Sequence, residues 1–217
     1  MGFVIAVDGP AASGKGTIAS KLGAAYGLPV LDSGLLYRAI GLAVIDEGGD
    51  LDVEADCVRA ARSLDFANLH GERFRTRTAG EAASRVAVHP AVRETLIAFQ
   101  RDFARREPGA VIDGRDIGTV IVPDAPAKIY VTASAEARAT RRWRQLLGLG
   151  ESADYEAILA DVRKRDARDA ARAAAPMRPA DDAVLLDTTD LDIDSAFDAA
   201  RRIVEDARAH REQSPKG

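Results

Sequence analysis

The 217-residue sequence predicts a three-layer α/β fold in which helices cover both faces of a parallel central sheet. Short apolar strand candidates alternate with amphipathic helix candidates in both halves of the chain, and crossover connections of this kind join parallel strands. A glycine-rich loop directly follows the first strand candidate and leads into a helix. Because ligands bind beyond the carboxyl ends of parallel strands, we expect polar residues that follow the strands to share one rim.

The first strand candidate, Phe3 to Val7, runs into the sequence DGPAASGKGT and a predicted helix from Gly16 to Tyr26. Gly9 and Gly14 bracket four residues and precede Lys15, a spacing that lets backbone N–H groups surround a polyphosphate. Lys15 would supply a cation for the β- and γ-phosphates, and the helix dipole would face the same anion. This P-loop predicts ATP-binding residues Gly9, Pro10, Ala11, Ala12, Ser13, Gly14, Lys15, Gly16 and Thr17.

The position after Lys15 is Gly16, and the first hydroxyl comes one residue later, at Thr17. In many P-loop NTPases the hydroxyl directly after the lysine ligates Mg²⁺, whereas the Gly-Lys-Gly-Thr form resembles nucleoside monophosphate kinases. There the metal would be held mostly by nucleotide oxygens and water. Asp113, which ends a later apolar strand, is equally consistent with an acid that reaches Mg²⁺ through water and with a turn-forming residue before Gly114.

The next elements are a short strand from Pro29 to Leu31 and a helix from Gly34 to about Glu47, which Ser33 would cap. A more polar stretch follows and is predicted to be an insertion. Its expected elements are a helix from Val53 to Leu64, a hairpin of Leu64 to Leu69 and Arg73 to Thr76 around His70-Gly71, and helices from Glu81 to Val88 and Ala91 to Arg105.

Strands and helices alternate again from Gly109. The expected strands are Ala110 to Ile112, Lys128 to Val131 and Val184 to Leu186, and the expected helices are one that Ser134 caps, one from Asp154 to about Ala175, and one from Ser195 to Arg208. Arg138, Arg141, Arg142 and Arg144 are interpreted as a solvated helix face, with an arginine clamp as the alternative. Arginines and aspartates alternate along the helix from Asp154, which is typical of surface ion pairs.

Composition limits the classes of function. A net charge of −4, from 30 basic and 34 acidic residues, gives no overall field that would attract nucleic acid or an anionic membrane. The single cysteine, Cys57, cannot form an internal disulfide and is expected to be a buried side chain in a reducing compartment. Apolar runs are shorter than a membrane span, and no leader precedes the first strand. We expect a cytoplasmic protein.

Three stretches together resemble those of a known family: DGPAASGKGT, LDSGLLYRA from Leu31 to Ala39, and DGRDIGTVIVPDAPAK from Asp113 to Lys128. A fourth, RKRDARDAAR from Arg163 to Arg172, lies where that family has its lid. Over nearly its whole length the chain resembles the bacterial cytidylate kinases, which are nucleoside monophosphate (NMP) kinases. The resemblance implies a P-loop kinase fold with a core of residues 1–47 and 106–217, an inserted NMP-binding domain at 48–105 and a short lid at about 148–175.

The same resemblance implies transfer of the ATP γ-phosphoryl group to CMP or dCMP by a monomer, with Mg²⁺ bound mainly through the ATP phosphates. Lys15, Arg115 and Arg172 would be catalytic, and Arg38 would join the two arginines around the phosphates, whose oxygens match the guanidinium donors. The remaining CMP-binding residues implied are Ser84, Arg93 and Asp116 at the cytosine, Arg165 and Asp169 at the pentose, and Ser33 and Tyr37 in the same pocket. The compact hairpin from Asp65 to Thr76 departs from the family, which has a longer three-stranded arm there.

Three alternatives remain on the sequence. Another P-loop kinase, for AMP or a sugar acid, is disfavoured by the DGRD stretch and the two arginine clusters. A nucleotide-binding switch that hydrolyses GTP would need an Asn-Lys-x-Asp motif, yet the only asparagine is Asn68. A kinase-like protein that binds nucleotide without turnover is consistent with the same residues.

Overall fold

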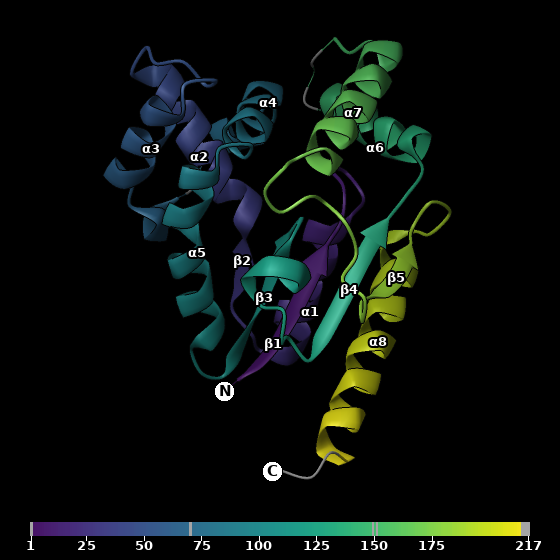
Figure 1. Cartoon of the computed structure of the whole chain (residues 1–217). Helices are drawn as coiled ribbons and strands as arrows, with labels where there is room; N and C mark the ends of the chain where they lie inside the picture. Colours follow the sequence, from purple (N-terminus) through teal and green to yellow (C-terminus); the bar gives the residue numbers. More distant parts are fainter. Residues whose placement is uncertain (1, 70, 149, 151, 214–217) are drawn as a thin grey trace.

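The computed structural model describes residues 2–69, 71–148, 150 and 152–213. Its centre is a five-stranded parallel sheet in the order β2-β3-β1-β4-β5 (Figure 1). The predicted parallel sheet is therefore confirmed, and the carboxyl ends of β3, β1 and β4 lie side by side at one rim. The strands are β1 (Phe3–Asp8), β2 (Val30–Asp32), β3 (Gly109–Gly114), β4 (Ala127–Thr132) and β5 (Val184–Asp187).

Alternation along β1 explains the three layers, because successive side chains of a strand point to opposite faces. Val4 and Ala6 join an apolar cluster with the helices α2 to α5, whereas Ile5 and Val7 join a second cluster with α1 and α8. The helices are α1 (Lys15–Tyr26), α2 (Ser33–Asp46), α3 (Glu54–Ser63), α4 (Arg77–Val86), α5 (Pro90–Arg105), α6 (Ala135–Gly148), α7 (Tyr155–Ala170) and α8 (Ile193–Gln213).

Helices α6 and α7 form a unit above the carboxyl ends of the strands (Figure 1). They share a separate apolar cluster that includes Leu146, Ile158 and Val162, and the Trp143 ring meets Tyr155 edge-on at 6.5 Å between centroids. Helix α4 of the polar insertion lies opposite α7 across the rim. The division into core, inserted domain and lid stays a prediction, and so does the boundary at about residue 148, although α6 and α7 pack as one hairpin.

The predicted hairpin in the insertion is wrong. The segment instead forms 3₁₀ turns at Phe66–Asn68 and Glu72–Arg75, while His70, at the predicted turn, lies outside the described residues. Phe66 and Leu69 pack against the cluster that contains α3 and α5, and the Phe66 and Phe99 rings lie 5.7 Å apart. Two short strands without a third partner are marginal, and packing onto the helices decides the conformation.

Two predicted helix ends also differ. Asp32, not Ser33, caps α2, because its carboxylate accepts a hydrogen bond from the Leu35 N–H at 3.1 Å and Ser33 is already the first helical residue. Helix α7 ends at Ala170 rather than about Ala175. The chain turns back there, so that the Asp169 carbonyl accepts hydrogen bonds from Met177 N and Arg172 Nε. By contrast, Ser134 does cap α6, since its hydroxyl accepts from Ala137 N.

Two expectations about side-chain environment can be compared with the structure. Cys57 is fully buried, as predicted. Arg138 is buried rather than solvated, because its guanidinium pairs with Asp166 of α7 and donates to the carbonyls of Ala133 and Ala11. None of the helices in the described ranges is long and apolar enough to cross a membrane.

Candidate active site

The glycine-rich loop forms a concave turn between β1 and α1, as its spacing predicts. Gly9 has a φ of 143°, and a Cβ there would lie 1.9 Å from the Val131 carbonyl oxygen, so only glycine fits. Gly14 has a φ of 89°, and even Ala12 adopts a positive φ of 59°, a strained value for a residue with a side chain. The first N–H groups of α1 have no acceptor within the helix and are available to an anion.

Lys15 lies at the start of α1 with its ammonium group inside the site. Its Nζ is 3.9 Å from Asp113 Oδ2, and only 13% of its side chain is exposed. Burial and the nearby Arg115 charge lower the pKa of Lys15 to about 8, while burial raises the pKa of Asp113 to about 6. Asp113 lies within β3 and faces this lysine, which favours the acid near the phosphate cradle over the turn-forming alternative.

The side chains predicted to bind the monophosphate come from five elements, and those of α4, α7 and the end of β3 meet in one network. Asp169 of α7 is its centre: it accepts hydrogen bonds from Ser84 of α4 and Arg115 after β3, each at 3.2 Å. Burial opposes ionisation of this carboxyl, but Arg115, Arg165 and Arg172 outweigh it and lower its pKa. The network therefore joins α4, α7 and the end of β3 before any ligand is considered.

A second pair lies deeper and involves the predicted base-reading residues. Arg93 of α5 forms a buried ion pair with Asp116, and its guanidinium lies 5.7 Å from the centre of the Tyr37 ring. Burial raises the pKa of Asp116 despite this partner. Ser33, at the start of α2, packs against the backbone of Gly114, where a Cβ would come within 2.6 Å of the Ser33 hydroxyl.

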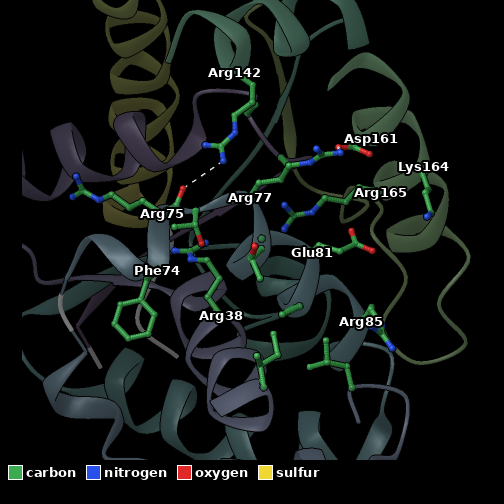
Figure 2. A pocket seen from close by; sticks show the side chains of 18 of the residues that line it. Arg38, Phe74, Arg75, Arg77, Glu81, Arg85, Arg142, Asp161, Lys164 and Arg165 are labelled. Carbon is green, nitrogen blue, oxygen red and sulfur yellow. Dashed lines mark hydrogen bonds and ion pairs between the residues drawn. The ribbon is translucent and has the colours of Figure 1, made fainter. Parts of the chain in front are cut away.

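A cleft of about 1380 Å³ lies between α2 and α4 on one side and α6 and α7 on the other. Figure 2 shows Arg38, from α2, and Arg165, from α7, extending into it from different elements. Ala11 and Ala12 of the glycine-rich loop line the same cleft, whereas the Arg93–Asp116 pair and Arg172 are buried outside its lining. Arg38 is held by Asp32 at 2.6 Å.

Three arginines around this site keep buried nitrogens that no described residue accepts from: Arg38 Nε, Arg165 Nε and Arg172 Nη2. Buried guanidinium donors are costly to leave unpaired. Burial and the like charge of Arg115 lower the pKa of Arg165 to about 10, so the cluster is short of negative charge. Phosphate oxygens are the acceptors that such forked donors match best.

The described residues contain no cluster of three or more His, Cys, Asp or Glu side chains that could hold a metal ion. The oxygen-bearing side chains at the cradle include Asp113, the exposed Thr17 and the buried Ser13. This donor set suits a Mg²⁺ ion that is bound mainly by phosphate oxygens and water, since Mg²⁺ usually keeps several waters.

Comparison with known proteins agrees with this geometry. Residues 5–206 match the family model described as cytidylate kinase. The chain belongs to the cytidylate kinase family. It is similar to cytidylate kinases of Caulobacter vibrioides, with 65% identity over 97% of this chain and 100% of the relative, and of Xanthobacter autotrophicus, with 61% identity over 96% and 100%.

Among solved structures, the chain is similar to a gluconokinase from Sinorhizobium meliloti 1021, with a TM-score of 0.53, 16% identity and coverage of 99% and 98% of the two chains. At this identity the likeness shows the fold alone, and it confirms the predicted P-loop kinase fold. Within the cytidylate kinase family the residue roles inferred from the sequence stay predictions, but the structure brings those residues together at one rim.

Sequence reasoning missed several residues of this cytidylate kinase site. Asp32 lines the cleft and holds Arg38, and its place at the end of a strand was a usable signal. Thr188, after β5, donates its hydroxyl to the Ser13 carbonyl of the cradle at 2.9 Å, although 175 residues separate the two. Asp8 is buried and accepts two backbone hydrogen bonds. For Thr188 and Asp8 the sequence gives no signal of the partners that they contact, because those partners are 175 and about 110 residues away.

Proposed function

We propose that this protein is an ATP-dependent kinase of CMP and dCMP that gives CDP or dCDP, and that it acts as a monomer. The observation that carries the proposal is a set of buried guanidinium nitrogens, on Arg38, Arg165 and Arg172, that have no hydrogen-bond partner among the described residues, together with the glycine-rich cradle. Such a site has room and charge for two phosphate groups that face each other. Family membership supplies the identity of the acceptor nucleotide.

Phosphoryl transfer needs little covalent chemistry from a protein. It requires the two phosphates to be held in line, their charge to be neutralised and water to be excluded. In this proposal the backbone N–H groups of the cradle bind the ATP phosphates, and Lys15 neutralises the β- and γ-phosphates. The monophosphate is held by Arg38, Arg115 and Arg172, whose fixed forks orient its attacking oxygen.

On binding, CMP would replace contacts that the protein makes with itself. The Arg115 and Ser84 bonds to Asp169 and the Arg93–Asp116 pair occupy groups that the ligand needs. Asp116 would accept from the exocyclic amine of cytosine and Arg93 would donate to its ring nitrogen or carbonyl. Mg²⁺ fits the site as an ion held by the ATP oxygens, with Asp113 reaching it through water, and it would supply neutralisation of phosphate charge.

The test is release of ADP in a coupled assay with CMP, dCMP, UMP and AMP, each with Mg²⁺ and again with EDTA. We expect Mg²⁺-dependent turnover with CMP and dCMP and much less with UMP and AMP. Equal rates with all four, or none above the ATP background, would contradict the proposal.

A matched pair of arginine variants ties the activity to the site. Arg165→Ala removes a guanidinium that lines the cleft and is 24% exposed, whereas Arg163→Ala, on the same helix, removes one that is 61% exposed and pairs with Glu136. We expect KM for CMP to rise only in the first variant. A rise in both would mean that the effect comes from general loss of positive charge.

A further inference from the structure

The residue directly before the phosphate cradle has a role that the proposed function leaves unexplained. Asp8 is the last residue of β1, and only 6% of it is exposed. A buried carboxylate is costly unless its oxygens accept hydrogen bonds. Asp8 Oδ1 accepts from Ile117 N at 2.8 Å, and Oδ2 accepts from Gly118 N at 2.7 Å.

The two donors belong to the turn that carries the predicted phosphate- and base-binding residues. Ile117 and Gly118 open a short π-helical turn, Ile117–Ile121, which directly follows Arg115 and Asp116. The first N–H groups of a helical turn have no partner within it. Asp116, in the capping position, makes no side-chain bond to these groups, and the Asp8 carboxylate takes that place.

Both ends of this connection are closely packed. On one side Asp8 pairs in register with Gly114 of β3 and Tyr130 of β4, and a Cβ on the following Gly9 would meet the Val131 carbonyl oxygen at 1.9 Å. On the other side a Cβ on Gly118 would lie 3.2 Å from Lys128 Cδ and 3.4 Å from Asp8 Oδ2. A shift of the turn would therefore disturb its contacts with β1 and Lys128.

We propose that Asp8 is a positioning residue for phosphoryl transfer, which fixes Arg115 and Asp116 at a set distance from the phosphate cradle. This inference rests on the proposed function and adds to it a residue outside the nine cradle positions and the nucleotide-contacting set. Asp8 touches neither phosphate, because its oxygens are turned toward the Ile117 and Gly118 N–H groups. It acts by preventing the acceptor side of the site from sliding relative to the donor side.

Asp8→Asn is the informative variant, because it keeps the size of the side chain but turns one acceptor oxygen into an NH₂ group that opposes a backbone N–H. Burial raises the pKa of Asp8 to about 7, against its two backbone hydrogen bonds, so the fold already accommodates a neutral side chain near neutral pH. Thr119→Val, on the same turn, is the control, since the buried Thr119 hydroxyl has no partner among the described residues.

We expect Asp8→Asn to lower kcat with CMP by roughly ten- to a hundredfold, as small misplacements of a positioned group do. KM for ATP should change little because the cradle is intact, and Thr119→Val should match the wild type. A double-mutant cycle measures the coupling between Asp8 and Arg115, which a merely structural role of Asp8 would not produce. If Asp8 acts through Arg115, Asp8→Asn should cost almost nothing further in an Arg115→Ala background.

Two results would overturn the role: normal kcat in Asp8→Asn, or an equal, fully additive loss when Arg115 is already alanine. Both are read in a wild-type background that phosphorylates CMP, so they leave the proposed function standing. A wild-type protein inactive with CMP would overturn the function and this role together. If Asp8→Asn does not fold, Asp8→Ser replaces it in the same cycle, because the shorter side chain removes the carboxylate acceptors without placing an NH₂ group against the backbone N–H groups.

Discussion

The two halves of the site are built in different ways. The ATP side is made of backbone: Gly9, Gly14 and the first turn of α1 form it within ten residues of sequence, and strain at Ala12 is part of its shape. The predicted CMP side is made of side chains that come from α2, α4, α5, α7 and the end of β3; several of them pair with one another, while some arginine nitrogens have no hydrogen-bond partner. In the proposed function the first half needs little rearrangement, whereas groups of the second half exchange partners when CMP binds.

This difference has an energetic consequence. Binding of phosphate to the cradle should cost little free energy for rearrangement, because the backbone conformation that the predicted function requires is already present. On the predicted CMP side several contacts with the ligand would replace contacts within the protein, such as the Arg115 bond to Asp169, and for these the net gain in affinity is the difference between two similar free energies. Substitutions on the ATP side should therefore mainly lower turnover. Substitutions on the CMP side should mainly alter the selectivity between monophosphates and the contacts that couple the helices.

The largest effect should come from Lys15→Ala, which removes the only side-chain cation of the predicted cradle segment 9–17. Loss of such an electrostatic contact typically lowers kcat by on the order of 10² to 10³. Lys21→Ala, on the same helix but with its ammonium 2.7 Å from Asp194 at the surface, is the control and should be near normal. Near-normal turnover of Lys15→Ala with CMP would mean that the cradle is misassigned.

Arg172→Ala should come next, because Arg172, just after α7, has a buried Nη2 without a hydrogen-bond partner and its charge interacts with Asp169 and Asp116. We expect transfer to slow by about a hundredfold, as for loss of one preorganised donor, with a smaller loss of ATP affinity. Single-turnover rates and ATP titration measure the two, with Arg163→Ala, on α7, as the control. Equal losses of transfer rate and ATP affinity would place Arg172 on the ATP side. The two sides would then not differ in the way proposed.

The cradle could be predicted from sequence because its geometry is local: glycine spacing, Lys15 and the adjoining helix all fall within one stretch. The parallel sheet followed from the alternation of elements. On the CMP side Asp169 and Ser84 meet across 85 residues, and spacing alone carries no such information, so only the family pattern identified them. The failed hairpin at Leu64 to Thr76 and the early end of α7 have one cause, since tertiary contacts overrode local propensity.

A smaller effect is expected on the CMP side, in the selection of cytosine over uracil. Asp116 accepts from Arg93 in the unliganded site and is predicted to accept from the cytosine amine, where uracil would present a carbonyl oxygen instead. Such an opposed pair of acceptors costs about 1–3 kcal/mol, which favours CMP over UMP by roughly ten- to a hundredfold. Asp116→Asn should lower CMP activity and the CMP-to-UMP ratio of kcat/KM, while Asp124→Asn, in an exposed loop, should change neither. A proportional loss for both substrates would make Asp116 a structural partner of Arg93.

The smallest effect concerns stability, and it compares Asp113 at the cradle with Asp169 at the centre of the side-chain network, whose pKa values shift in opposite directions. Burial raises the pKa of Asp113, beside the cradle, from 3.8 to about 6, whereas the surrounding arginines outweigh burial and lower the pKa of Asp169. Between pH 4 and 6 the folded chain therefore keeps a proton on Asp113 that the unfolded chain has released. Unfolding then releases that proton, so the free energy of unfolding falls as pH rises through this window.

Each pKa unit corresponds to about 1.4 kcal/mol, or about tenfold in the folding equilibrium. Asp8, whose pKa burial raises to about 7, acts in the same direction. Urea unfolding at pH 4, 5, 6 and 7 should therefore show a fall that Asp113→Asn reduces, because a neutral amide has no proton to release. Asp169→Asn should leave that fall in place and instead lower stability at neutral pH, since it removes the charge that Arg115 and Arg165 need. If both variants change the pH dependence alike, Asp113 and Asp169 lie in equivalent environments. The contrast between a backbone cradle and a side-chain network then does not extend to these two charges.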